Sequence, residues 1–116
     1  ISYNFIKSME TYPYLIEYYL TATNKKPFKE WLDGLDIGAR AKIRVRLDRV
    51  RIGNLGKNRS VGEGVYELKV DYGPGYRVYY ALNGKTVVLL LLGGDKSTQK
   101  KDISQAKAYW QDYKER

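Results

Sequence analysis

The sequence predicts an α+β fold in which a small, twisted, mainly antiparallel sheet packs against helices. The stretch from Gly62 to Gln99 has the pattern of three strands joined by two tight turns. Two segments before it and one after it repeat apolar residues at helical spacing. The expected order is therefore strand, helix, helix, three strands and helix, with residues 1–116 as one domain and the helices on one face of the sheet.

The N-terminal half supplies the first strand and two helices. The run Tyr14–Leu20 is rich in Tyr and Ile, which predicts a strand at a sheet edge or beside the last strand. Pro27 suits the first position of a helix, and Asp36 is the expected N-cap of a second helix that reaches about Ile52. The expected core residues of these helices are Phe28, Trp31, Leu32, Leu35, Ile43, Leu47 and Val50. The glycine-rich, basic stretch from Gly53 to Gly64 is expected to be a loop.

The three later strands are expected at Val65–Asp71, Tyr76–Leu82 and Thr86–Leu92. Gly73–Gly75 predicts the first turn, and Asn83-Gly84 predicts a two-residue hairpin. Since side chains alternate between the two faces of a strand, one face should be apolar and the other polar. The polar face would carry Glu67, Lys69, Asp71, Arg77 and Tyr79. If the first turn pairs Asp71 with Arg77, Lys69 lies opposite Tyr79.

A glycine-bearing segment, Gly93–Gln99, connects the last strand to the final helix. Ser97 or Thr98 is expected to cap that helix, whose apolar stripe comprises Ile103, Ala106, Trp110 and Tyr113. The spacing of its Gly and Lys residues differs from that of a Walker A loop. Lys96 could contact a nucleic-acid phosphate there, or it could be an exposed lysine in a capped turn.

Composition narrows the classes of function. The chain has 116 residues, a formal net charge of +8, and neither Cys nor His, so thiolate sites, disulfides and histidine-dependent catalysis are excluded. The charge favours an anionic partner, with nucleic acid ahead of an acidic protein or a membrane surface. The second helix is strongly basic, through Arg40, Lys42, Arg44, Arg46, Arg49 and Arg51. It could bind RNA phosphate or an acidic segment of a partner. No metal or cofactor is expected, and the short apolar runs and the absence of a signal pattern indicate a cytoplasmic protein without a membrane partner.

Cations on the polar face suggest chemistry on phosphate. Arg77, Lys69 and Lys96 together could stabilise the extra negative charge of a phosphoryl-transfer transition state. Glu67, Lys69 or Tyr79 could move protons if the site shifts their pKa values toward neutrality. The structural alternative is that Arg77 is held in an ion pair with Asp71.

Three segments, GLD, RIGNLGKNRSVGEGVYELKVDYGPGYRVYY and LLLLGGDKSTQKKDISQAKAYW, resemble the addiction-module killer branch of the RelE/ParE toxin superfamily, close to HigB-type toxins. The resemblance runs from about residue 12 to the C-terminal end. It implies two N-terminal helices packed on a twisted sheet. It also implies a toxin that cuts messenger RNA in the ribosomal A site by attack of the 2′-hydroxyl, and an antitoxin, of the helix-turn-helix type, encoded beside it.

The resemblance also implies roles for individual residues. Arg77 is the arginine of the family's GYR motif, Lys69 the basic residue of the preceding strand, and Lys96 that of the loop after the last strand. The superfamily often has Tyr or His near the start of the final helix, where this chain has Lys101-Asp102-Ile103, which leaves Tyr79 or Glu67 for proton transfer. The residues expected to bind RNA are Arg59, Lys57, Arg44 and Arg51. The alternatives are a ParE-like DNA gyrase inhibitor and a non-catalytic nucleic-acid-binding module.

Overall fold

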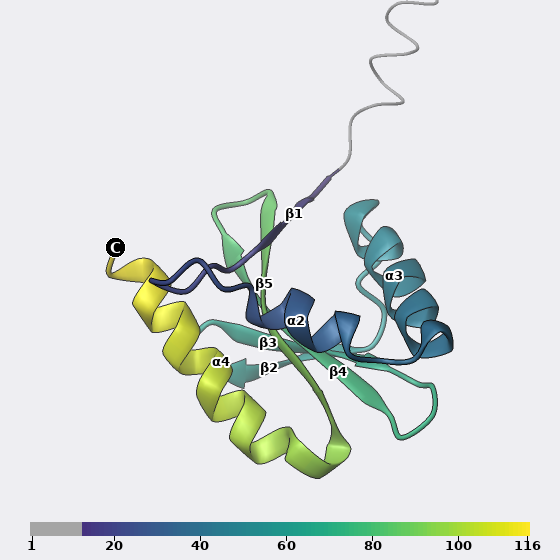
Figure 1. Ribbon diagram of the computed structural model, residues 1–116. Coiled ribbons are helices and arrows are strands. Elements are labelled where there is room, and N and C mark those ends of the chain that lie inside the picture. Colours follow the sequence, from purple (N-terminus) through teal and green to yellow (C-terminus); the bar gives the residue numbers. More distant parts are fainter. Residues whose placement is uncertain (1–12) are drawn as a thin grey trace, which may run out of the picture.

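The computed structural model describes residues 13–116, and the expected α+β fold is confirmed. Five strands form one sheet, and helices pack against it (Figure 1). The elements in chain order are β1 (Leu15–Tyr18), α2 (Pro27–Asp33), α3 (Ile37–Arg51), β2 (Asn58–Gly62), β3 (Val65–Val70), β4 (Tyr76–Asn83), β5 (Val87–Asp95), the 3₁₀ turn η1 (Lys96–Thr98) and α4 (Gln99–Lys114). Within residues 13–116, no helix has the length and apolar character needed to cross a bilayer.

The strand order in the sheet is β1-β5-β4-β3-β2, with β1 parallel to β5 and the other pairs antiparallel. The first strand therefore lies both at a sheet edge and beside the last strand, as predicted. Strand β2 lies within the stretch expected to be a loop, so that prediction was wrong. Its sequence, NRSVG, lacks an alternating apolar pattern because β2 is a largely exposed edge strand.

Two predictions about turns were wrong, one in strand register and one in loop length. Val70 pairs with Tyr76, so Lys69 lies opposite Arg77 and not opposite Tyr79. The connection takes five residues because Gly73 and Gly75 both adopt a positive φ, which lets the chain reverse over a wider turn. In the second hairpin Asn83 pairs with Val87, which leaves a three-residue loop.

Helices cover both faces of the sheet, not one as expected. Helices α2 and α3 close a core that includes Phe28, Ile43, Leu68, Val78 and Leu90. Helix α4 closes a second core that includes Val65, Tyr79, Ala81, Leu91 and Ala106. The face expected to be polar is therefore mostly apolar, with Lys69 and Arg77 near the β3–β4 turn and Glu67 further along β3.

The local predictions for α3 are confirmed, and those for the start of α4 only in part. Asp36 caps α3 through a hydrogen bond from the Ala39 N–H. Thr98 occupies the N-cap position of α4 without a capping side-chain bond, whereas Asp95 accepts a hydrogen bond from the N–H of Ser97 at 2.8 Å. Gly94 belongs to β5, where a Cβ would collide with Asp102.

Candidate functional site

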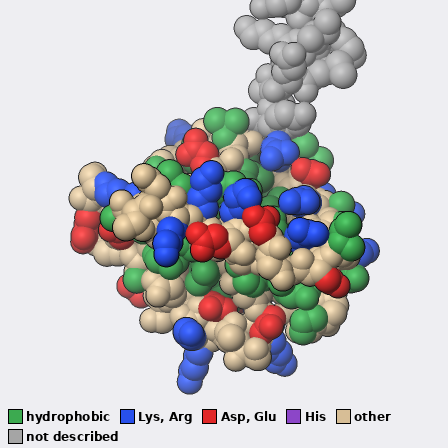
Figure 2. Space-filling model, viewed as in Figure 1, with side chains coloured by type: hydrophobic (Ala, Val, Ile, Leu, Met, Phe, Trp, Pro, Cys, Tyr) green, Lys and Arg blue, Asp and Glu red, His purple; other side chains and the backbone are tan. Residues whose placement is uncertain are grey.

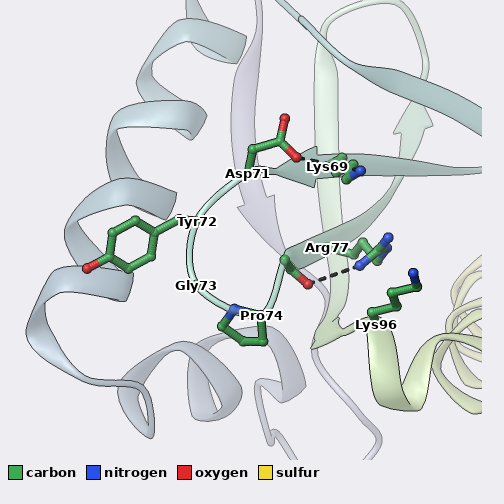
Figure 3. Close-up of a pocket in the computed structure, with 8 residues that line it drawn as sticks. Lys69, Asp71, Tyr72, Gly73, Pro74, Arg77 and Lys96 are labelled. Atoms are coloured by element: carbon green, nitrogen blue, oxygen red, sulfur yellow. Dashed lines mark hydrogen bonds and ion pairs between the residues drawn. The ribbon is translucent and has the colours of Figure 1, made fainter.

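A cavity of about 360 Å³ lies between the β3–β4 turn and the start of η1. We call it the turn cavity; its lining residues are Lys69, Asp71, Tyr72, Gly73, Pro74, Gly75, Arg77 and Lys96. Lys69 comes from β3, Arg77 from β4 and Lys96 from η1, so three separate elements bring these cations together. In Figure 3 the side chains of Lys69, Arg77 and Lys96 extend to the same side of the turn, whereas the Tyr72 ring points toward the helices.

Arg77 is buried and held by its own turn. Its side chain is 8% exposed, and one Nη donates to the carbonyl oxygen of Gly75 at 3.0 Å. Its Nε lies 3.8 Å from Oε2 of Glu67 and is a buried nitrogen without a hydrogen-bond partner within residues 13–116. Glu67 therefore faces the Nε side of this buried guanidinium, and the Arg77 side chain is open to a ligand only where it lines the cavities.

The ion pair between Arg77 and Asp71, the structural alternative, does not form. Asp71 instead pairs with Lys57 at 2.9 Å and with Lys69 at 3.5 Å, and the hydrogen bond from Lys57 is the main cause that lowers the pKa of Asp71. The register explains the difference, because Asp71 lies beyond the last pair of the β3–β4 ladder. Arg77 is therefore not neutralised by the carboxylate nearest to it in the turn.

A second cavity, of about 410 Å³, adjoins the turn cavity and shares Lys69 and Arg77 with it. We call it the amide cavity; its lining residues are Lys57, Asn58, Arg59, Glu67, Lys69, Arg77 and Gln99. Two side-chain amides and one carboxylate line it, so it offers acceptors as well as donors. The two cavities thus present different chemistry on the two sides of Arg77.

Glu67 is the centre of a buried hydrogen-bond network. It is 5% exposed and accepts hydrogen bonds from Arg59 at 2.9 Å, Gln99 at 2.8 Å and Tyr79 at 3.1 Å. Burial alone would raise the pKa of Glu67, but these donors outweigh it and hold that pKa below its ordinary value. Burial, with the Glu67 charge beside it, raises the pKa of the Tyr79 hydroxyl far above its ordinary value. Both pKa values move away from neutrality, so the condition for proton transfer by either group is not met.

Of the residues expected to bind RNA, two lie at the site and two do not. Lys57 and Arg59 line the amide cavity. Arg44 and Arg51 line a separate cavity of about 350 Å³ beside β1, and Arg51 donates to Asp48 at 3.1 Å.

The sequence analysis assigned no role to Gln99 or Asn58 of the amide cavity, and it named Lys42, Arg46 and Arg49 only as part of the basic second helix. Gln99 was assigned no role because nothing in its local pattern shows that the first residue of α4 contacts β3. A groove of about 520 Å³ is lined by Lys42, Arg46 and Arg49 of α3 and extends to Lys69. The basic character of that helix was the feature of the sequence that pointed to these three residues. Figure 2 shows Lys and Arg side chains gathered across the middle of the face in view, with acidic side chains among them. Within residues 13–116, no three acidic side chains lie close enough to hold a metal ion.

Comparisons with known proteins place the chain in a family. The family model described as "Phage derived protein Gp49-like (DUF891)" matches residues 30–111, which include α3, the sheet from β2 to β5 and most of α4. An "Uncharacterized protein" from Haemophilus influenzae (strain ATCC 51907 / DSM 11121 / KW20 / Rd) is 51% identical over 81 residues, covering 69% of this chain and 82% of the relative. The chain therefore belongs to the Gp49-like family, a toxin-like family of the RelE/HigB addiction-module type.

Proposed function

We propose that this protein is the toxin of a type II toxin–antitoxin system and cleaves messenger RNA on the ribosome. The observation that carries the proposal is the turn cavity, where Arg77, held by the carbonyl oxygen of Gly75, lies beside two lysines. Such a cluster of donors fits a phosphodiester, whose oxygens accept hydrogen bonds and carry charge. Membership of a toxin-like addiction-module family supports the toxin role and implies a cognate antitoxin as a partner.

The proposed reaction is an internal transesterification of RNA. The 2′-oxygen attacks the neighbouring phosphorus, the bond from phosphorus to the 5′-oxygen breaks, and a 2′,3′-cyclic phosphate and a 5′-hydroxyl result. The 2′-hydroxyl loses its proton to solvent water, and the departing 5′-oxygen gains one from an acid of the site. Arg77, Lys69 and Lys96 would stabilise the extra charge on the phosphoryl oxygens, an effect for which each donor contributes about 100-fold or more in rate.

The buried network suggests positioning roles for the two groups that were expected to transfer protons. Glu67 would hold Arg59 and Gln99 in place, and Tyr79 would hold Glu67 from below the sheet surface. Lys69 is then the proposed proton donor to the 5′-oxygen, because it lies on the wall that both cavities share. Lys57 would bind an RNA phosphate beside the reacting one.

The test compares variants that remove one charge each. Lys96→Gln and Arg77→Ala, expressed from an inducible promoter without an antitoxin, should relieve the growth arrest that the parent protein causes. Lys85→Gln is the matched control, because it removes one charge in the β4–β5 loop away from both cavities. Circular dichroism of each purified variant checks that the fold is retained.

Three results would contradict the proposal. Unimpaired growth with the parent protein would remove the toxin role. Arrest with intact messages and trapped gyrase–DNA complexes would select the ParE-like inhibitor. Arrest relieved equally by the Lys85 control would show that net charge, and not the turn cavity, carries the effect.

A further inference from the structure

The amide cavity has the chemistry of a base-reading site, because it combines side-chain amides, a carboxylate and an arginine. Its volume of about 410 Å³ falls within the range of about 300–1,000 Å³ typical of small-ligand sites. Through Lys69 and Arg77 it is continuous with the turn cavity. A nucleotide whose phosphate lies in the turn cavity could therefore place its base in the amide cavity.

Gln99 presents a free acceptor in this cavity. Its Nε2 donates to Oε2 of Glu67 at 2.8 Å. The orientation of the amide follows from chemistry, since an ionised carboxylate only accepts hydrogen bonds and must face the NH₂ group. The three hydrogen bonds to Glu67 keep it ionised, so Oε1 of Gln99 is left to accept a hydrogen bond from a ligand.

Arg59 presents free donors in the same cavity. Its Nε bonds Oε1 of Glu67 at 2.9 Å, which fixes the plane of the guanidinium. The side chain is 60% exposed, so its Nη groups are accessible to a ligand. Gln99 and Arg59 thus contact the two oxygens of one carboxylate. They lie close enough together for a single base to contact both side chains. Asn58 differs, because its Nδ2 donates to the Gly56 carbonyl oxygen and its Oδ1 accepts from Tyr80.

An arginine fork beside one acceptor selects among the four bases. Guanine offers two adjacent acceptors, O6 and N7, next to the N1–H donor, and bidentate contact of Arg with O6 and N7 is the commonest specific pairing. Adenine and uracil lack two adjacent acceptors, and cytosine fills less of the cavity. We propose that the amide cavity binds the nucleobase next to the scissile phosphate and prefers guanine through Arg59 and Gln99. This inference rests on the proposed function, since it takes the ligand to be RNA.

The experiment titrates the purified full chain with the 3′,5′-bisphosphates of guanosine, adenosine, cytidine and uridine, followed by calorimetry and amide NMR shifts. Each of these probes carries one phosphate on the 3′-oxygen and one on the 5′-oxygen of the ribose, so the four compounds differ only in the base. The guanosine compound should bind at least about tenfold more tightly than the other three. The amide NMR shifts that the guanosine compound causes should include those of Gln99 and of residues in β2 and β3. Inorganic phosphate alone should not cause these additional shifts.

Two variants separate reading of the base from binding of the phosphate. Arg59→Lys keeps the charge but loses the fork, and Gln99→Met keeps the volume but loses the amide, both its free acceptor and its hydrogen bond to Glu67. Each should reduce the guanine preference to within about threefold while inorganic phosphate binds as before. Lys85→Gln should leave the preference unchanged.

The possible outcomes also separate this inference from the proposed function. Equal affinity for all four bisphosphates, or a preference that survives in both variants, overturns the inference even when the parent protein still cleaves messages. Absence of binding by any bisphosphate overturns it as well. Loss of message cleavage with a retained guanine preference would overturn the proposed reaction and leave the base site standing.

Discussion

Glu67 and Asp71 lie on the same side of one strand's path, four residues apart, and both neutralise cations at the site. Glu67 is 5% exposed and accepts from three side chains, whereas the side chain of Asp71 is 56% exposed and contacts two exposed lysine side chains. Water screens the exposed pair, while the buried carboxylate depends on its protein donors. The comparison indicates that Glu67 sets the geometry of the site and Asp71 only moderates its charge.

The largest expected effect is on stability. Glu67→Ala should lower the free energy of unfolding by about 3 kcal/mol, because it leaves the buried Tyr79 hydroxyl without its acceptor and the buried Arg77 without its counter-charge. Asp71→Ala should change it by less than about 1 kcal/mol, since its pairs are exposed. Urea unfolding of both variants beside the parent measures the difference. Equal losses in the two variants would contradict the contrast between the two carboxylates.

The second prediction concerns pH. Because the pKa of folded Glu67 lies below its ordinary value of 4.5, the group contributes stability that is present above the unfolded pKa and is lost as the pH falls through the folded pKa. Unfolding free energy should therefore fall on acidification below about pH 4.5, and Glu67→Gln should flatten that dependence. Asp71→Asn is the control, because it removes another carboxylate whose pKa is lowered but whose ion pairs are exposed. A pH profile unaltered by Glu67→Gln would show that the network does not hold the ionised form.

The smallest expected effect is on anion affinity. Asp71→Asn should tighten binding of inorganic phosphate by a few fold, because Lys57 and Lys69 lose a competing carboxylate. NMR titration at low ionic strength measures this affinity, and added salt should reduce the difference in affinity between the variant and the parent. Weaker binding in the variant would mean that Asp71 positions the lysines and does not merely screen them.

Local signals in the sequence were sufficient for the helices and for the cation set. The Asp36 cap and the spacing of Ile43, Leu47 and Val50 located α3, because capping and helical periodicity depend on residues close in sequence. Lys69, Arg77 and Lys96 could be singled out from their strands and from the resemblance, and the structure brings them to one cavity.

Contacts between distant segments could not be predicted in the same way. The β3–β4 register depends on a turn with two glycines at positive φ, and a shift of two residues preserved the alternation while changing every partner. Strand β2 exists through its pairing with β3 rather than through a pattern of its own. The burial of Tyr79 depends on α4, and the role of Gln99 depends on where α4 begins relative to Glu67.

The most direct test of the central claim is to map RNA ends, with their chemistry, after brief induction of the parent protein and of Arg77→Ala. The account predicts new ends within translated codons that carry a 2′,3′-cyclic phosphate and a 5′-hydroxyl, reduced about 100-fold or more in the variant. Intact messages in arrested cells, or the same ends at the same rate with Arg77→Ala, would contradict a phosphodiester site at the turn cavity.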